Sequence, residues 1–282
     1  MKKLIALLMT LILAVSCFAA CAPKNDAPAT TAAADDTTAA ADDTTAAAAT
    51  DLSYIQDNGK LIVGITDYAP MDYKDDNGEW TGFDAEFAQL FAKELGVECE
   101  FFVIADWGKK FVELETKNID AVWNGMTITD EAKLNASVSN PYVVNAQVLV
   151  MKADKIASYK DAASIADLAV AVENGSAGQD AAEAAGVKNI IAVQDQAAAL
   201  LEVKAGTSDA CVIDITMANA MTGEGTDYAD LAAGFSLTSE EYGVAFRKDS
   251  DLTAKFNDFM AKLIADGTLQ ALADKYELTL AK

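Results

Sequence analysis

Segments typical of β-strands alternate with segments typical of α-helices from Leu52 to the end of the chain. The strand-like segments are residues 60–65, 98–104, 119–125, 168–173, 188–193 and 209–214. The helix-like segments are residues 84–96, 108–118, 178–186, 195–205, 251–266 and 268–276. Such alternation builds sheets of parallel strands that helices cover. Because it occurs in two stretches, it predicts two α/β lobes.

The composition narrows the functions that such a chain can perform. A net charge of −23 at pH 7 argues against a basic surface for nucleic acid, so we expect no nucleic-acid partner. The chain has no histidine, which excludes a Ser-His-Asp triad and a histidine-based zinc site. We therefore expect no metal and no cofactor. Catalysis by a carboxylate pair survives in principle, but among 44 acidic residues chance pairs are common.

The first 21 residues, MKKLIALLMTLILAVSCFAAC, have the layout of a secretory signal. Two lysines precede an apolar run, which is followed by small residues and a cysteine. The end of this segment resembles a bacterial lipobox, in which cleavage exposes a cysteine that carries a diacylglycerol. We expect residues 1–20 to be the signal peptide and Cys21 to be lipidated, with Cys17 as the alternative.

Residues 21–50 are expected to form a disordered tether behind the lipidated cysteine. From residue 22 this segment is rich in Ala, Thr and Asp, repeats DDTTAAA, and holds no large apolar residue that could enter a core. No other apolar stretch is long enough to span a bilayer. The sequence therefore predicts a body outside the cytoplasm that a lipid anchor holds at the cell membrane, in a periplasm or at the cell surface.

The loops that follow the predicted strands hold polar and aromatic residues that a core would not need. These loops are residues 66–73, 105–109, 124–133, 173–178 and 214–218. Ligands of open α/β sheets bind beyond the carboxyl ends of the strands. The sequence therefore predicts that a ligand site lies among these loops.

Six motifs occur in an order that resembles the family 3 solute-binding proteins of bacterial ABC importers, the type that binds polar amino acids. The motifs are LIVGITDYAPMDY with GEWTGFDAEFAQLFAKELG, NIDAVWNGMTIT, NPYVVNAQVLV, DLAVAVENGSAG, AGTSDACVID and EEYGVAFRKDS. The resemblance covers residues 55–278. It implies an α/β fold of the type II periplasmic-binding-protein kind, in which two lobes close about a hinge on a ligand in the cleft between them.

The resemblance also implies where the lobes divide. Lobe 1 would comprise residues 51–145 and a return segment, residues 241–282, and lobe 2 would comprise residues 146–240. The strands that cross between the lobes would lie near residues 147–151 and 242–246.

The function implied by the resemblance is that of an extracytoplasmic receptor. The protein would be a monomer that binds a small polar solute, such as an amino acid or a related amine. It would deliver this solute to the transmembrane subunits of an ABC permease with its ATPase, and it would not be an enzyme. A carboxylate-based enzyme such as a dehydratase, the ligand-sensing module of a signalling receptor and a surface adhesin are the alternatives.

Several positions match residues that contact the ligand in the family. They are Asp67, Tyr68, Trp107, Asn124, Gly125, Thr127, Glu173, Ser176, Ala177 and Asp214. By the resemblance, two aromatic rings, Tyr68 and Trp107, pack on opposite sides of the ligand. The Gly125 carbonyl and the Thr127 hydroxyl contact its amine and carboxylate, and Asp214 receives its ammonium group.

One further match concerns the carboxylate of the ligand. Three of the matched positions could instead have a purely structural role. The loop at Ser176 and Ala177 would donate N–H groups to that carboxylate. Asp214 follows an apolar strand, so it could instead cap the next helix. Tyr68 could serve lobe packing, and the Thr127 hydroxyl could satisfy the loop backbone.

The chain departs from the family at the residue that binds the ligand's α-carboxylate. The family motif Thr-x-Glu-Arg ends in an arginine that grips this group with two hydrogen bonds, but this chain has Ala132 there. Lys133 is one residue late, which is about 100° around a helix. The single arginine, Arg247, lies on the returning strand, and Glu173 stands where some relatives carry a lysine or a neutral residue.

These departures make the predicted cleft more negative. We therefore predict a net-neutral or cationic solute, with an amine on Asp214 and an apolar or π face between Tyr68 and Trp107. Acids at Asp67 and Asp72 lie nearby in the sequence. A zwitterionic amino acid remains an alternative if the loops supply enough N–H and O–H donors.

Overall fold

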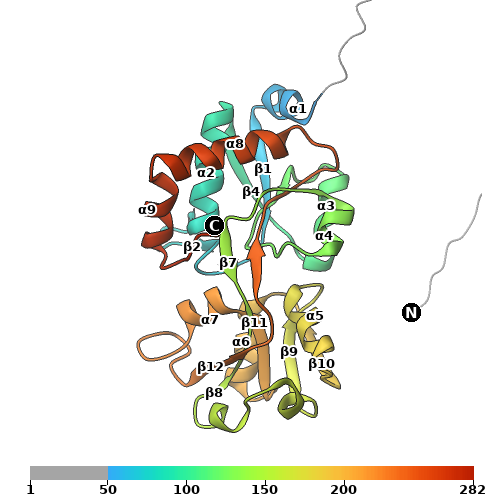
Figure 1. Cartoon of the computed structure of the whole chain (residues 1–282), viewed down its shortest axis with the longest axis vertical. Coiled ribbons are helices and arrows are strands. Elements are labelled where there is room, and N and C mark those ends of the chain that lie inside the picture. The colour runs from blue at the N-terminus through green and yellow to red at the C-terminus, as the bar shows by residue number, and fades with distance from the viewer. Residues whose placement is uncertain (1–49) are drawn as a thin grey trace, which may run out of the picture. The chain divides into compact units, whose positions relative to one another are not determined.

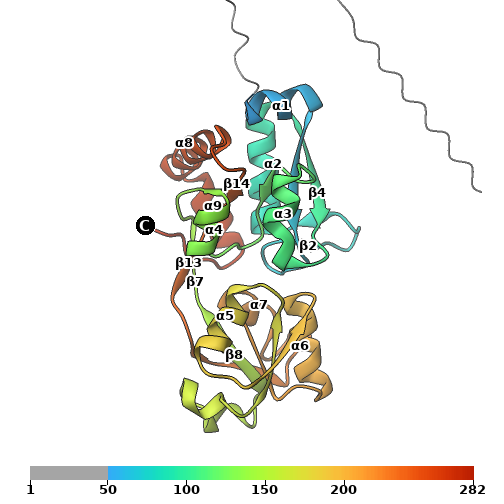
Figure 2. The same cartoon turned by 90° about the vertical axis from the view of Figure 1, so that its right-hand side faces the viewer.

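The computed structural model describes residues 50–282, which form two lobes that are each built on a five-stranded sheet (Figures 1 and 2). The predicted signal peptide, Cys17, Cys21 and nearly all of the tether lie outside the described residues. Within residues 50–282, no helix is both long and apolar enough to cross a bilayer. The two sheets confirm the predicted two-lobed α/β fold.

Lobe 1 is built on a sheet with the strand order β4-β1-β5-β14-β6. Strand β1 is parallel to β4 and β5, whereas β14 is antiparallel to β5 and β6. The bounds are β1 (Lys60–Ile65), β4 (Glu98–Val103), β5 (Ala121–Val122), β6 (Ser137–Val138) and β14 (Ala245–Phe246). Because β14 lies far along the chain from the other strands, the chain returns to lobe 1 after it has built lobe 2.

The helices of lobe 1 bury apolar faces, as α2 shows. Its Phe83, Phe87, Phe91 and Leu95 recur every four residues, which places them on one face, and all are buried. The Phe87 ring packs edge-on against Trp123 at 5.0 Å between centroids. The helices of this lobe are α1 (Asp51–Asn58), α2 (Phe83–Leu95), α3 (Lys110–Glu115), α4 (Asp130–Asn135), α8 (Leu252–Ala265) and α9 (Thr268–Lys275), and a short hairpin joins β2 (Tyr73–Lys74) to β3 (Trp80–Thr81).

Lobe 2 is built on a sheet with the strand order β10-β9-β11-β8-β12. The first three strands of this order are parallel, and β8 is antiparallel to both of its neighbours. The bounds are β8 (Gln147–Lys152), β9 (Ala169–Glu173), β10 (Asn189–Val193), β11 (Ala210–Asp214) and β12 (Leu231–Ser236). The helices are α5 (Ala177–Ala184), α6 (Gln196–Ala205) and α7 (Ile215–Met221), with 3-10 turns η2 (Ile156–Ser158) and η3 (Ala162–Ile165).

Two short strands connect the lobes, and they lie earlier in the chain than the sequence predicted. Strand β7 (Val143–Asn145) pairs antiparallel with β13 (Glu240–Tyr242), and Figure 2 shows them side by side between the lobes. Predicted crossing segment 147–151 is instead β8, a buried inner strand of lobe 2 that is hydrogen-bonded on both sides. The prediction was wrong because it carried the crossing position over from the resemblance, whereas in this chain the pairing of β8 with β11 and β12 places residues 147–151 inside the sheet of lobe 2. The exact lobe boundaries, 145/146 and 240/241, stay predictions.

Strand β5 and helix α3 are shorter than their predicted spans, 119–125 and 108–118. The carboxylate of Asp120 accepts the Ile62 N–H at 2.9 Å, and the Asn124 amide oxygen accepts the Thr66 N–H at 3.0 Å. These side chains take the place of ladder bonds at both ends of β5. The predicted helix begins as a 3-10 turn, η1 (Trp107–Lys109), before α3.

Candidate functional site

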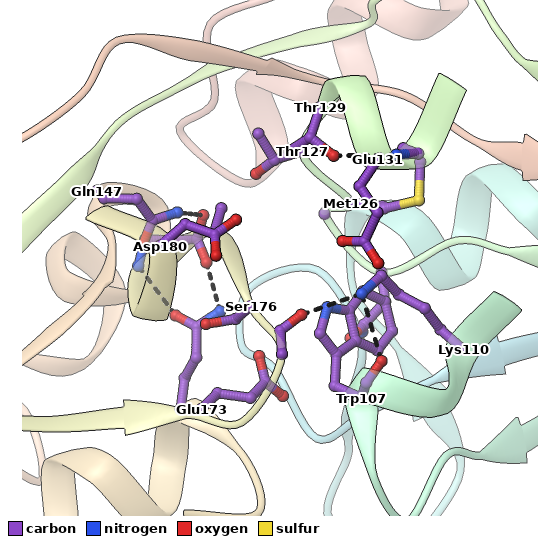
Figure 3. A pocket seen from close by; sticks show the side chains of 17 residues that line it. Trp107, Lys110, Met126, Thr127, Thr129, Glu131, Gln147, Glu173, Ser176 and Asp180 are labelled. Carbon is purple, nitrogen blue, oxygen red and sulfur yellow. Dashed lines mark hydrogen bonds between the residues drawn. The ribbon is translucent and has the colours of Figure 1, made fainter. Parts of the chain in front are cut away.

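A pocket lies between the lobes, and loops that follow the sheet strands form much of its wall (Figure 3). Lobe 1 contributes Trp107, Lys110, Asn124, Gly125, Met126, Thr127, Thr129, Glu131 and Ala132. Lobe 2 contributes Gln147, Glu173, Gly175, Ser176, Ala177, Asp180, Gln196 and Asp214. The cavity measures only ≈ 30 Å³, far below the ~300–1,000 Å³ of ordinary ligand pockets. A solute of amino-acid size therefore enters a more open arrangement of these walls.

The pocket gathers all of the predicted ligand residues except Asp67 and Tyr68. Asp67 is exposed on the loop after β1, whereas Tyr68 is buried, with its hydroxyl hydrogen-bonded to Thr216 and Tyr242. The Tyr68 ring lies behind Gly125, where a Cβ would come within 2.6 Å of its Cε1. Direct contact of Asp67 and Tyr68 with the solute stays a prediction.

Backbone and side-chain contacts hold the loop of lobe 1 that follows β5. The Asn124 amide donates to Asp72 at 2.7 Å, and Asp72 is fully buried outside the pocket lining. The Thr127 hydroxyl donates to Glu240 Oε1 at 2.8 Å, so a side chain rather than the loop backbone is its partner. The second contact joins the edge of the pocket to β13, one of the two strands that connect the lobes.

The carboxylate of Asp214 faces the pocket rather than the helix that follows it. Asp214 occupies the N-cap position of α7, but its side chain accepts no hydrogen bond from that helix. It accepts instead from Gln147 Nε2 at 2.9 Å, from the Tyr242 hydroxyl at 2.8 Å and from the amides of Asn145 and Gln196. The capping alternative was therefore wrong.

Burial raises the pKa of Asp214 to about 7, and the nearby charge of Glu240 adds to this effect. The Gln147 amide donates to both carboxylates, at 2.9 Å to Asp214 and 2.7 Å to Glu240. No lysine or arginine of the described residues forms an ion pair with either of them. Two acids thus share neutral donors, which leaves their negative charge uncompensated.

Glu173, the last residue of β9, has an oxygen that lacks a partner. The side chain is 3% exposed, and its Oε1 makes no hydrogen bond to any described residue. Burial raises the pKa of Glu173 well above its usual value, and the charges of Asp214 and Asp195 raise it further. Gln147 Oε1, also in the lining, is likewise buried and without a partner. The pocket therefore contains two buried hydrogen-bond acceptors that have no donor among the described residues.

Of Ala132, Lys133 and Arg247, only Ala132 lines the pocket. Ala132 is buried in the pocket wall, and its N–H donates to the hydroxyl of Thr129, the N-cap of α4, at 3.1 Å. Lys133 is exposed and belongs to a separate surface depression. Arg247 does not line the pocket and is instead buried in ion pairs with Asp51 and Asp120, each at 2.9 Å.

Lys110 is a pocket residue that the sequence reading missed. Its side chain is 6% exposed, and its ammonium group donates to the carbonyl oxygens of Trp107 at 3.3 Å and Gly175 at 3.0 Å (Figure 3). Burial lowers its pKa, although nearby acids oppose this effect. The sequence did hold a signal for this position. Lys110 follows the predicted ligand residue Trp107 by three residues, and residues three apart lie on the same face of a helix.

The lobes touch on both sides of the pocket, so the structure is closed. On one side the Asn174 amide donates to Asp106 at 2.9 Å. Gly175, with φ of 69°, comes so close to Gly108 that a Cβ would lie 2.5 Å from its Cα. On the other side the Tyr68 hydroxyl contacts Thr216.

Four carboxylates and one ammonium group line the pocket. Glu173 and Asp214 are buried in its interior with Lys110, whereas Glu131 and Asp180 are exposed at its mouth and come from different lobes (Figure 3). Burial raises the pKa of Asp180, and the charge of Glu131 adds to it. No three acidic or cysteine side chains of residues 50–282 are grouped closely enough to hold a metal ion. The four carboxylates are therefore distributed over the pocket wall and do not form one compact cluster.

Comparison with known proteins places this geometry among solute receptors. Residues 61–279 match the family described as bacterial extracellular solute-binding proteins, family 3. The L-cystine-binding protein TcyJ of Escherichia coli is 31% identical over 229 residues, which are 80% of this chain and 85% of that protein.

Two solved structures share the fold, which confirms the type II periplasmic-binding-protein class. A mutant of ArgBP from T. maritima has a TM-score of 0.75 at 32% identity, over 80% of this chain and 98% of that chain. The ancestral amino acid-binding protein AncCDT-1, described as a precursor of cyclohexadienyl dehydratase, has a TM-score of 0.73 at 34% identity, also over 80% and 98%.

Proposed function

This chain belongs to the bacterial extracellular solute-binding proteins of family 3, and we propose that it delivers a positively charged amino acid or amine to an ABC permease. Proteins of this family bind small solutes outside the cytoplasm. The relatives include proteins named for cystine, arginine and glutamine, so the family alone does not define the charge of the solute.

The observation that carries the proposal is the unpartnered, buried carboxylate oxygen of Glu173. A buried acceptor without a donor costs free energy, and a buried carboxylate without a counter-charge costs several kcal/mol. Glu173 and Asp214 share one wall of the pocket, and both pKa values are raised by burial. An ammonium or guanidinium group supplies both the N–H donors and the positive charge that this wall lacks.

The closed arrangement supports binding by hinge closure. The connection between the lobes is narrow, since β7 and β13 pair over only three residues. The Asp106–Asn174 hydrogen bond exists only when the lobes meet. A solute that contacts Glu173 in lobe 2 and Trp107 in lobe 1 favours the closed state, because it binds both walls only when they are together.

We propose that the pocket binds its solute without transforming it. A pKa near 7 would suit acid–base catalysis, and the likeness to AncCDT-1 gives this alternative a basis. However, donors from Asn145, Gln147, Gln196 and Tyr242 hold the Asp214 carboxylate in a fixed orientation, which supports a binding role. A solute recovered unchanged after long incubation, as measured by NMR, supports a receptor, and steady turnover would contradict it.

The anchor and the oligomeric state complete the proposal. We propose that acylated Cys21 holds the protein at the outer face of the cell membrane and that residues 22–50 act as a spacer. The described lobes carry both walls of the pocket in one chain, which supports a monomeric receptor.

Titration calorimetry with four solutes tests the function. L-Arginine and L-lysine should bind most tightly, L-glutamine more weakly and L-glutamate most weakly, because only the last adds a second carboxylate to a negative pocket. Glu173→Gln should weaken L-arginine binding by about 10-fold or more. Tighter binding of L-glutamate than of L-arginine would contradict the proposed charge of the solute.

A further inference from the structure

We propose that Lys110 is a specificity-determining residue whose ammonium group binds a carboxylate of the solute. The solute would then be an amino acid, which carries both charges, rather than a simple amine. This inference rests on the proposed function and deepens it, because it assigns a second, anionic end to the ligand in the same pocket.

Lys110 is the sole cationic side chain among the described residues that line the pocket. Its side chain is 6% exposed. Helix α4 contributes only Ala132 and the exposed Glu131 to the wall, and neither carries a positive charge. A solute carboxylate in this pocket therefore has Lys110 as its available counter-charge.

The ammonium group of Lys110 also has one N–H donor without a partner among the described residues. It has three N–H groups, and its two acceptors in the structure are the neutral carbonyl oxygens of Trp107 and Gly175. Although Glu131, Glu173 and Asp180 influence it, none forms an ion pair with it. A buried ammonium group without a paired anion is costly, and a carboxylate from the solute removes that cost.

A second donor lines the same pocket as Lys110. The N–H of Ala177, at the first turn of α5, makes no hydrogen bond to the described residues. The Ser176 hydroxyl accepts the N–H of Gln179 at 3.2 Å, which leaves its own O–H as a further donor. Lys110 contacts the carbonyl of Gly175, two residues before Ala177. A carboxylate between Lys110 and Ala177 would thus bind donors from both lobes.

The charges of the pocket then orient the solute. Its carboxylate would lie at Lys110 and the start of α5, and its positive groups would face Glu173, Asp214 and the unpartnered oxygen of Gln147. The acids at the mouth, Glu131 and Asp180, disfavour a solute with excess negative charge. A basic amino acid, with two cationic groups and one carboxylate, satisfies both ends.

The test compares two solutes that differ only in a carboxylate. L-Arginine and agmatine, its decarboxylated form, are titrated calorimetrically into the wild-type protein and the variant Lys110→Met. The wild type should bind L-arginine about 10- to 100-fold more tightly than agmatine. Lys110→Met should abolish most of this preference through a loss of L-arginine affinity, with agmatine affinity unchanged or improved.

Two further variants make the result specific to the position of the charge. The matched control Lys133→Met removes an exposed lysine outside the pocket and should leave both affinities unchanged. Ala132→Arg, added to Lys110→Met, should restore the preference for L-arginine, because residue 132 also faces the pocket. If Lys110→Met unfolds, Lys110→Gln replaces it, and the thermal transition of each variant is measured without solute.

The outcomes separate this inference from the proposed function. An L-arginine to agmatine affinity ratio that is the same in the wild type and in Lys110→Met would overturn the role of Lys110, and so would equal binding of the two solutes by the wild type. Either result would leave a receptor for cations intact. Failure of the wild type to bind either solute, together with binding of L-glutamate, would instead overturn the proposed function.

Discussion

The ammonium group of Lys110, on α3 of lobe 1, donates a 3.0 Å hydrogen bond to the carbonyl oxygen of Gly175 in lobe 2. The backbone of Gly175 also meets Gly108 of lobe 1 with no room for a side chain. These contacts join lobe 1 to lobe 2, so they form only when the lobes are closed. Changes at Gly175 should act on closure rather than on the folding of either lobe.

Gly175→Ala should oppose closure. A Cβ at this position would lie 2.5 Å from Gly108 Cα and 2.9 Å from its nitrogen. Solute affinity should fall by about 10-fold or more, because the closed state binds best. The matched control is Gly206→Ala, which has a similar φ of 79° but no neighbouring atom within 4 Å. A comparable loss of affinity in both variants would show that backbone strain, not the clash, is responsible.

Arg247 is predicted to stabilise lobe 1 rather than to bind solute. Its guanidinium group is 9% exposed and bridges Asp51 and Asp120, each at 2.9 Å. Arg247→Met leaves a buried carboxylate unpaired and should lower the free energy of unfolding by about 3–5 kcal/mol. Urea unfolding measures this value. Lys188→Met, which breaks a fully exposed ion pair, is the control and should have little effect.

Solute affinity should depend on pH through the acids of lobe 2. Burial raises the pKa of Asp214 from 3.8 to about 7 and raises that of Glu173 well above its usual value. Protons therefore compete with the cation of the solute as the pH falls below 7. Calorimetry should show L-arginine affinity at least about 10-fold weaker at pH 5.5 than at pH 8. Equal affinity at both values would mean that these carboxylates do not meet the cation.

The same raised pKa should affect the stability of the solute-free protein. Between pH 3.8 and about 7 the folded protein keeps a proton on Asp214 that the unfolded chain releases. The contribution of Asp214 to stability therefore falls as the pH rises through this window. Asp214→Asn cannot titrate, so its stability relative to the wild type should increase from pH 5 to pH 8. A difference between the two proteins that is constant with pH would contradict the burial of an ionisable Asp214.

Cys21 is predicted to carry the membrane anchor. Cys21→Ser should move the protein from the membrane fraction to the soluble fraction of the producing cell, because a spacer without large apolar residues follows. Cell fractionation with an antibody against the body measures this distribution. Retention of Cys21→Ser in membranes, with release only after Cys17→Ser, would assign the lipid to Cys17.

Periodicity was sufficient to predict most of the fold. The predicted strand 60–65 coincides with β1, and α2 and α6 each begin within one residue of the prediction, because their apolar spacing and glycine ends are local signals. The connecting strands were misplaced because their positions were carried over from the resemblance, and no local pattern in the residues marks them. Which strand enters which sheet depends on contacts with distant segments.

The site was less predictable than the fold. Glu173 and Ser176 could be named from the resemblance, and both lie at the carboxyl end of β9, which faces the pocket. Lys110 was missed since a lysine on an amphipathic helix is usually exposed, and only packing against Gly175 buries it. Tyr68 was named from the resemblance, but its hydrogen bonds to Thr216 and Tyr242 place it behind the pocket wall.

Small-angle X-ray scattering with two solutes tests the central claim, closure on a cation, most directly. Scattering curves are recorded for the solute-free protein and at equal, high concentrations of L-arginine and L-glutamate. The account predicts that L-arginine lowers the radius of gyration, because it draws Glu173 and Trp107 onto one ligand, and that L-glutamate leaves it unchanged. Compaction by L-glutamate without compaction by L-arginine would contradict the account.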